Sequence, residues 1–386
     1  MLPCLAVACL AGGIHPSAAQ NTTKAAFVCK INPQETLLHQ SNRLMLEELA
    51  LQPVSATQAG YHEHNGISLD AQLDDIGPEA MARERALLGD AQRCFAKVDE
   101  SKLTGEDKAD LTLVRSSIDE DIFARDVRQP EHYRPERPVE HIGTALFFPL
   151  TQNYGTEQQR LTNVVARMEQ VPRYLKQAQA NLRESDPVFI DTAVNEAPGD
   201  KQVIAQIAQQ IPASSPLHAR YEAAAQAANQ AIDAYVAWMK DDLANRPHTR
   251  TWRSGPEVYA RIFRFAVGTD TGQTPATLLA SAERDLAAVR EQMYAIAKPL
   301  DAQWFPNVDH AGLSGEALEN RVIAEVIGRI NDDHTTPDQL LPTVQANAAK
   351  IADFIREKNL ITLSPSCPID DASLDRCSLQ DATAFA

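Results

Sequence analysis

The sequence lacks any run of basic residues. Acidic residues outnumber basic ones by 52 to 36, for a formal net charge of -16. Nucleic-acid binding requires clustered Lys and Arg that neutralise phosphates, so we do not expect a nucleic-acid partner. Binding to an anionic membrane surface is disfavoured for the same reason.

Motifs of common catalytic sites are missing as well. The sequence contains no Walker A loop, no GxGxxG loop and no GxSxG elbow around a serine, which argues against phosphate binding and serine hydrolase chemistry. No CxxC pair is present, so a zinc site built from cysteines is disfavoured. We therefore predict no catalytic residues, no metal ligands and no cofactor in this chain.

Long apolar runs are confined to the N-terminus, and none reaches the roughly 20 residues of a membrane span. The run from Leu2 to Ile14 precedes Ser17-Ala18-Ala19, small residues suited to cleavage, so residues 1–19 are interpreted as a signal peptide. Cys9 resembles a lipobox cysteine, but Ala6 stands where Leu is usual, and soluble secretion is favoured over lipidation. We expect a periplasmic or extracellular protein.

Four cysteines remain after the signal peptide, in a compartment that permits disulfides. They are Cys29, Cys94, Cys367 and Cys377, and they allow three pairings. A bond between Cys367 and Cys377 closes a short loop and is the simplest choice, which would leave Cys29 for Cys94.

Helical periodicity dominates the rest of the chain and strand signals are sparse. We predict an all-α fold, an irregular multi-helix array, over residues 20–364, followed by an irregular tail over 365–386. No internal repeat supports a solenoid. Helices are expected over 34–51, from 78, over 105–125, 156–182 with a break at Pro172, 215–245, two within 251–297, over 318–330 and over 336–358.

Two of these helices have apolar faces that we expect to be buried. The first comprises Leu161, Val164, Val165, Met168, Leu175, Ala178 and Leu182, and the second Leu217, Tyr221, Ala228, Ile232, Tyr235, Met239 and Leu243. Residues 127–155, rich in Pro, His and Arg, are predicted to be an irregular connection that carries His132 and His141 on the surface. Residues 360–364 are predicted to be a brief β-like run.

His62-Glu63-His64 is the densest group of potential metal ligands. A zinc peptidase helix needs two histidines on one face with the glutamate between them, whereas these histidines lie two apart beside Asn65-Gly66. A solvated loop is the favoured interpretation, and an HxH metal site the alternative.

Trp252, Glu257 and Tyr259 flank the turn at Gly255-Pro256, where a helix is expected to begin. A helix N-terminus that points into a cleft can bind an anion or a carboxylate, so we expect these three side chains to face a cleft. Simple capping is the alternative, because Glu257 in a first turn is favoured by the helix dipole.

Several stretches together resemble the bacterial domain-of-unknown-function family 885, over about residues 35–364. They are Gly60-Tyr61-His62 with Asp70 to Asp75, Arg167 to Leu182, Gly255 to Tyr259, Thr274 to Leu279, and Leu286 to Ala297. The resemblance implies an exported helical protein with a fold akin to that of helical zinc peptidases.

The zinc motif that the resemblance implies is His-Glu followed shortly by Pro-Gly-His, and in that family it lies in the C-terminal part. This chain lacks it: His62-Glu63 and Asn195 to Asp200 are the nearest fragments, and neither has the full set of histidines. Without them zinc cannot be held or its water activated. We therefore expect zinc only in a full-length relative, and interpret the chain as a truncated or frameshifted copy.

Two hypotheses follow for the function. The first is the N-terminal, non-catalytic portion of an exported zinc peptidase-like protein, which forms one side of a peptide-binding cleft and is inactive alone. The alternative is a non-enzymatic helical periplasmic binding or scaffold protein. A shortened chain would also expose an apolar face that the missing helices would otherwise cover.

Overall fold

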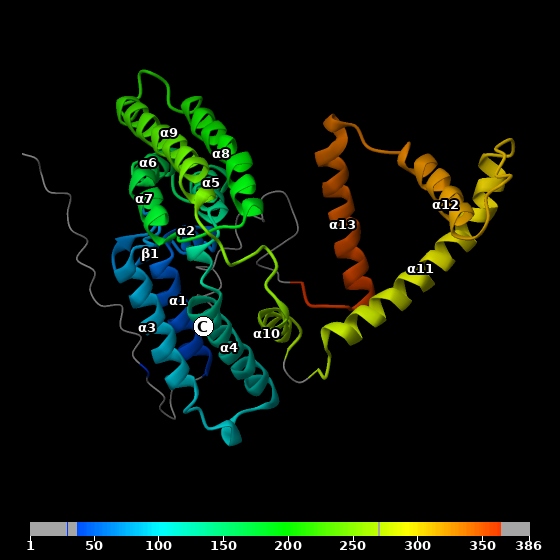
Figure 1. Ribbon diagram of the computed structural model, residues 1–386, viewed down its shortest axis with the longest axis horizontal. Coiled ribbons are helices and arrows are strands. Elements are labelled where there is room, and N and C mark those ends of the chain that lie inside the picture. Colours follow the sequence, from blue (N-terminus) through cyan, green and yellow to red (C-terminus); the bar gives the residue numbers. More distant parts are fainter. Residues whose placement is uncertain (1–28, 30–36, 269–270, 364–386) are drawn as a thin grey trace, which may run out of the picture.

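The computed structural model describes residue 29, residues 37–268 and residues 271–363. Within these ranges the fold is all-α, an irregular array of helices, as predicted (Figure 1). A two-stranded hairpin, which the sequence did not predict, is the only sheet in the described ranges. The expected signal peptide at 1–19, the tail at 365–386 and the cysteines Cys367 and Cys377 lie outside the described residues. No helix in the described ranges is long and apolar enough to cross a membrane.

The N-terminal helices form a small core of their own. It is built from α1 (Leu37–Leu51), α3 (Pro78–Phe95) and α4 (Gly105–Phe123), which bury Leu44, Leu87, Phe95, Leu111 and Ile118. Pro sets the first turn of α3, and a capping box begins α4. A disulfide joins Cys29 to Cys94 in α3, one of the pairings that the cysteines allow.

Between α1 and α3 the chain is mostly irregular. The short helix α2 (Pro53–Gln58) leads to the hairpin of β1 (Glu63–His64) and β2 (Ile67–Ser68). Asn65 and Gly66 form its turn with φ values of 51° and 79°, the left-handed region that this pair tolerates. Residues 69–77 then run without regular structure toward α3.

The prediction of an irregular connection over 127–155 is wrong for more than half of its length. After the π-helical turn η2 (Ala124–Arg128) and the short η3 (Pro130–His132), residues 136–151 form helix α5 (Glu136–Thr151). Pro138 lies in the first turn, where proline is tolerated, and Pro149 lies inside the helix, where the Ala145 oxygen accepts from Arg167 instead; both prolines obscure a regular apolar period. That face is fully buried at Ile142, Ala145 and Leu146.

The largest core lies where α5 packs with four further helices: α6 (Glu157–Met168), α7 (Val171–Asn181), α8 (Pro187–Ala208) and α9 (His218–Asp241). Both apolar faces expected from the sequence are buried in it. The chain breaks between α6 and α7, as the proline at position 172 predicts. Helix α8 is not anticipated by the sequence, because Pro198 and Gly199 interrupt its pattern. The short η4 (Leu243–Asn245) follows α9.

The last helices begin as predicted after Gly255 and at Thr274. Helix α10 (Pro256–Val267) lies against α4, with the Arg261 guanidinium 4.0 Å from the centre of the Phe123 ring. Then follow α11 (Pro275–Trp304), α12 (Gly315–Asn331), the short η5 (Pro337–Gln339) and α13 (Leu340–Lys358). Residues 360–363 form no strand, so the β-like run expected there is wrong.

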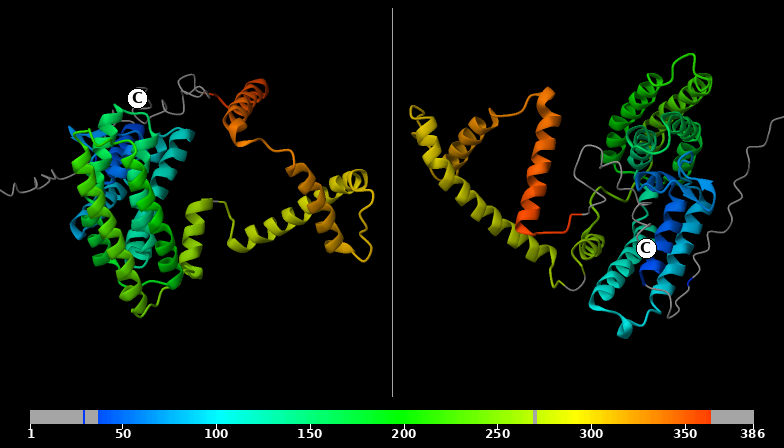
Figure 2. Two further views of the ribbon diagram at one scale, coloured as in Figure 1. Left: turned by 90° about the horizontal axis from the view of Figure 1, so that it is seen from above. Right: turned by 180° about the vertical axis from the view of Figure 1, so that it is seen from behind.

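Helices α11, α12 and α13 extend away from the other helices in all three views (Figures 1 and 2). Only α11 and α12 share a small core, around Ala297, Val322 and Val326. Large apolar side chains of α11 and α13 remain exposed: Leu279, Leu286, Val289 and Ile296 on the first, and Leu341, Val344, Ile351 and Phe354 on the second.

Candidate functional site

A cavity of about 240 Å³ lies between the N-terminal helices and the large core. Its wall combines the end of α1 and start of α2, residues 74–76, α3, the turns around 125 and 131, and α5 and α7. Most of the lining side chains are polar or charged. Its charged and aromatic lining residues include Asp74, Glu84, Arg125, Glu131, Arg134, Arg137, His141 and Tyr174.

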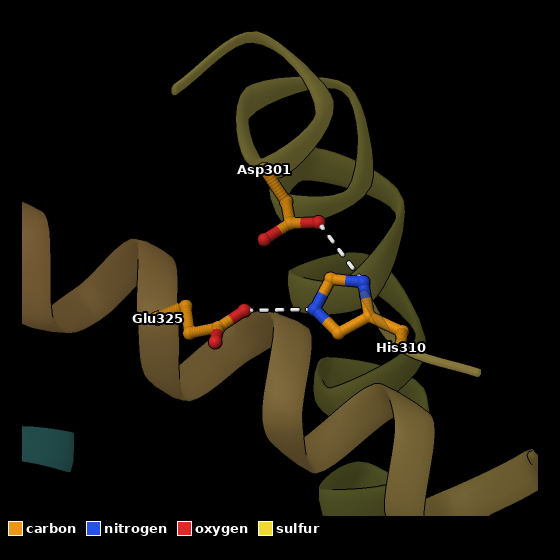
Figure 3. A group of neighbouring side chains, drawn as sticks. All are labelled: Asp301, His310 and Glu325. Carbon is orange, nitrogen blue, oxygen red and sulfur yellow. Dashed lines mark hydrogen bonds and ion pairs between the residues drawn. The ribbon is translucent and has the colours of Figure 1, made fainter. Parts of the chain in front are cut away.

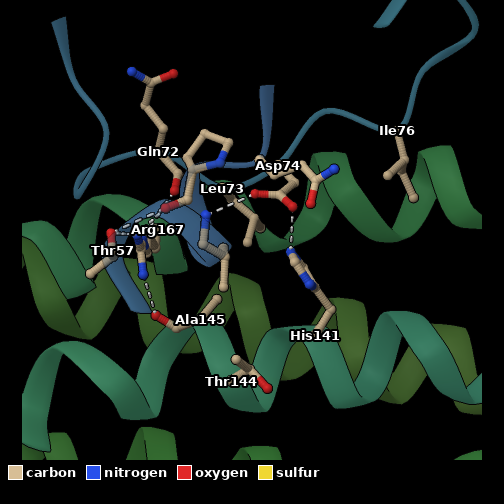
Figure 4. A network of polar contacts seen from close by, with 12 residues as sticks. Thr57, Gln72, Leu73, Asp74, Ile76, His141, Thr144, Ala145 and Arg167 are labelled. Atoms are coloured by element: carbon tan, nitrogen blue, oxygen red, sulfur yellow. Dashed lines mark hydrogen bonds and ion pairs between the residues drawn. The ribbon is translucent and has the colours of Figure 1, made fainter. Parts of the chain in front are cut away.

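A buried arginine holds one side of this region together (Figure 4). Arg167 of α6 is 0% exposed, and its guanidinium donates to the backbone oxygens of Pro53, Gln72 and Ala145 at 3.0 to 3.2 Å. It also donates to Thr57 Oγ1 at 2.5 Å. One side chain therefore ties α2, α5, α6 and the irregular stretch 69–77 into a single unit.

Asp74 connects this unit to the cavity. Its Oδ1 accepts a hydrogen bond from the Val54 backbone at 3.0 Å, and its Oδ2 lies 3.2 Å from His141 Nε2, an ion-pair distance without hydrogen-bond geometry. The His141 ring stacks on Tyr174 with centroids 5.2 Å apart. Burial, and secondly the Asp74 charge, raise the pKa of Tyr174, so its hydroxyl stays neutral.

The charges that line the cavity are not all paired. Arg125 binds Glu84 at 2.5 Å, and Arg134 binds Glu136. Arg137, in contrast, is exposed and makes no hydrogen bond or ion pair with a described residue. Glu131 Oε2 is buried and accepts no hydrogen bond from a described residue. The cavity wall thus contains an arginine without a partner and a glutamate with one buried, unpaired oxygen among the described residues, and sequence reasoning missed both because it treated this segment as a surface connection.

The HxH histidines have separate partners. His62 Nδ1 lies 2.9 Å from Asp70 Oδ1, and the His62 ring stacks on Tyr154 at 4.1 Å. His64 Nδ1 lies 2.8 Å from the Tyr61 hydroxyl oxygen. Within the described ranges these two histidines belong to no group of convergent ligands.

The three residues expected at a cleft are not part of the cavity wall. Trp252 and Tyr259 are each 51% exposed, and Glu257 is exposed. The Trp252 backbone donates to Asp186 Oδ2 at 3.1 Å. A few residues earlier, Arg246 donates to the backbone oxygen of Leu182, which lines the cavity.

A second polar group lies far from the cavity, between α11 and α12 (Figure 3). Asp301, His310 and Glu325 each offer one ligand atom within 4.8 Å of the others. No spacing motif marks these residues, which lie 9 and 15 positions apart, so sequence reasoning missed them as well.

Comparison with known families matches residues 53–382 to the model of a bacterial family of unknown function, DUF885. The chain belongs to the DUF885 family. This result agrees with the resemblance in the Gly60 to Asp75 and Arg167 to Leu182 stretches, which the structure brings together around Arg167. No curated protein matches the chain.

Among solved structures, this DUF885 chain is similar to a candidate lipoprotein of unknown function from Shewanella oneidensis. The TM-score is 0.64 at 19% sequence identity, over 89% of this chain and 66% of that one. The likeness shows a shared fold, and this chain spans just under two thirds of the length of that neighbour.

Proposed function

We propose that this chain is the non-catalytic, peptide-binding side of an exported, peptidase-like DUF885 protein. The observation that carries the proposal is the cavity with two unpaired opposite charges. A free peptide end has a carboxylate that suits Arg137, because guanidinium forks match carboxylates. The peptide amino group suits Glu131, a lining carboxylate with one oxygen that accepts no hydrogen bond from a described residue; a small rotation of this side chain would turn that oxygen toward the ligand.

The surroundings of the cavity support an extended ligand. Residues 246–252 run from the cavity wall at Leu182 to the half-exposed Trp252. Aromatic side chains with a large exposed area are typical anchors for bound chains. A peptide whose end fills the cavity would pass Trp252 and reach Glu257 and Tyr259 at the start of α10.

The sequence supports binding without cleavage. It has no His-Glu followed by Pro-Gly-His, and the cavity wall contains a single histidine, His141, already engaged with Asp74. Zinc peptidase chemistry needs at least three convergent protein ligands with an open position for water. We therefore expect no hydrolysis by the cavity.

Export is supported by the Cys29 to Cys94 disulfide, since disulfides persist mainly in oxidising compartments. The apolar N-terminal residues and the candidate lipoprotein among structural neighbours agree with it. Fractionation of cells that express the natural gene tests this part directly. Recovery of the protein in the cytoplasm with reduced cysteines would contradict export.

Calorimetric titration with short peptides tests the binding proposal. Peptides with both ends free should bind, and C-terminal amidation should weaken binding at least tenfold by removing the Arg137 partner. Arg137→Gln should weaken the free peptide equally and leave the amidated one unchanged. The matched control is Arg284→Gln, an exposed arginine of α11 that pairs with no described residue, and this variant should bind peptide like the wild type.

Two outcomes would reject the proposal. If no peptide binds, or if Arg137→Gln and Arg284→Gln bind alike, the cavity is not a peptide site and the scaffold hypothesis is favoured. If the chain cleaves peptides and a chelator abolishes the cleavage, its non-catalytic character is wrong.

A further inference from the structure

The group at Asp301, His310 and Glu325 has the composition of a divalent cation site. One imidazole nitrogen and two carboxylates form a mixed ligand set that suits zinc or manganese rather than calcium or magnesium. His310 Nε2 lies 2.8 Å from Glu325 Oε2, and His310 Nδ1 lies 3.8 Å from Asp301 Oδ2. The three residues come from the last turns of α11, the loop that follows it, and α12.

Local packing holds the group in place. Asp301 follows Ala297 by one helical turn, and Glu325 neighbours Val322 and Val326 on α12. These three apolar residues form the small core between the two helices, so the carboxylates project from the edge of that core. Arg321 donates to Glu325 Oε1 at 2.6 Å and leaves Oε2 directed at the imidazole.

Asp301 provides a second, independent observation. The residue is only 7% exposed, and its Oδ1 is buried without a hydrogen-bond partner. A buried carboxylate oxygen without a donor is costly unless a cation or a proton occupies the position. In Figure 3 the oxygen of Asp301 that is not joined to His310 lies on the side where the Glu325 carboxylate approaches the ring.

We propose that Asp301, His310 and Glu325 bind a single divalent transition-metal ion, with Zn²⁺ as the best match, which links α11 to α12. Ligand atoms of one tetrahedral zinc ion lie roughly 3.3 Å apart, and those of the three residues lie within 4.8 Å of one another, so side-chain rotation would bring both carboxyl groups to one nitrogen of His310. Water fills the remaining coordination position. The ion would sit outside the cavity described above and is independent of peptide binding.

The electrostatics of the group agree with this proposal. The carboxyl groups of Asp301 and Glu325 both lie beside the His310 ring, so two like charges are held close together. A cation between the two carboxylates would remove their repulsion. The competing arrangement is a metal-free group held by the contacts of His310 with both carboxyl groups, and it predicts no dependence of stability on zinc.

Zinc titration of the full chain, purified without a polyhistidine tag, separates the two arrangements. We expect one tightly bound Zn²⁺ per chain and a higher melting temperature with zinc than with chelator. Asp301→Asn, which keeps the shape of the side chain, and His310→Gln should each lower zinc affinity at least tenfold and abolish the zinc-dependent rise in melting temperature.

His334→Gln is the matched control. His334 follows α12 and is exposed beside Asp332 and Asp333, and among the described residues it bonds only to the backbone oxygen of Thr335. Its loss should leave zinc affinity unchanged. Co²⁺ bound in place of zinc should show the visible d–d absorption of a tetrahedral site in the wild type and in His334→Gln. This absorption should be absent in Asp301→Asn.

Equal zinc binding by the wild type and both ligand variants would overturn the proposal, as would the absence of stoichiometric binding. If His310→Gln unfolds, Asp301→Asn decides the question by the same measurements. Peptide binding is measured separately in the cavity, so failure at one site leaves the other unaffected.

Discussion

Asp200 of α8 lies directly against Gly143 of α5: a Cβ atom on Gly143 would come within 2.8 Å of Asp200 Oδ1. Asp200 is 5% exposed, and its Oδ2 has no hydrogen-bond partner among the described residues. Burial, and secondly the charge of Glu196, raise the pKa of Asp200 to about 7. The contact between the two helices therefore depends on a carboxyl group that is best tolerated when protonated.

Asp200→Asn should stabilise the protein at neutral and alkaline pH. The pKa of Asp200 is higher in the folded chain than in the unfolded one, so the folded state loses stability as pH rises from about 4 to about 7. The variant avoids this loss. Its free energy of unfolding should exceed that of the wild type by about 3 to 4 kcal/mol above pH 8, and the two should be equal below pH 4. Urea unfolding across this pH range measures it.

The exposed Asp191 of the same helix offers the control for that experiment. Asp191→Asn should retain the pH dependence of the wild type. Asp200→Asn could instead have the same free energy of unfolding as the wild type at every pH. That result would show that the Asp200 carboxyl is hydrated rather than buried.

Gly143→Ala should destabilise the protein, because the new methyl group would overlap the Asp200 carboxyl at the contact of α5 with α8. We expect a loss of about 1 to 3 kcal/mol, typical of overpacking in a core. Gly143→Ala combined with Asp200→Ala should lose less than the sum of the single changes, since truncation removes the overlap. If the losses in free energy of unfolding of the two single variants add exactly in the double variant, the contact between Gly143 and Asp200 is contradicted.

Arg167→Met should be among the most damaging single substitutions. It removes the donors that satisfy three backbone oxygens and Thr57, so we expect a loss of about 3 to 5 kcal/mol in the free energy of unfolding. Arg167→Lys should not restore it, because a single ammonium cannot reach all four acceptors. Arg284→Met, on an exposed face, should change stability by less than about 0.5 kcal/mol.

The bond between Cys29 and Cys94 should contribute strongly to stability. The two residues are 65 positions apart, and closing a loop of that length stabilises by about 4 kcal/mol in the chain-entropy model. Cys29→Ala should lower the melting temperature, and a reductant should have little further effect on that variant. A melting temperature of the wild type that is insensitive to reductant would argue against this bond.

Peptide ligands should protect residues 252–259 from hydrogen exchange, because a chain that leaves the cavity passes Trp252 before α10. Protection should disappear in Arg137→Gln. Protection confined to another face, such as the exposed apolar side of α11, would instead favour the scaffold hypothesis.

Much of the helical pattern could be read from the sequence because its signals are local. Thr156 with Gln159 predicts the start of α6, and the proline at 172 predicts the break before α7; both are confirmed. Prediction failed at α5 and α8, where Pro149 and Pro198 lie inside helices that tertiary packing stabilises. The candidate sites could not be predicted from the sequence. Arg137 and Glu131 follow no recognised spacing, and the group of Asp301, His310 and Glu325 follows none either.

The sequence by itself determined the all-α class, the acidic charge, the family resemblance and most helix starts, because caps, prolines and apolar periodicity act over a few residues. Only the tertiary structure decided which polar groups lose their water. It placed Asp200 against Gly143, buried Arg167 among backbone oxygens, and left α11 and α13 with exposed apolar faces. Such contacts depend on how distant helices pack, and burial then sets the cost of each unpaired charge.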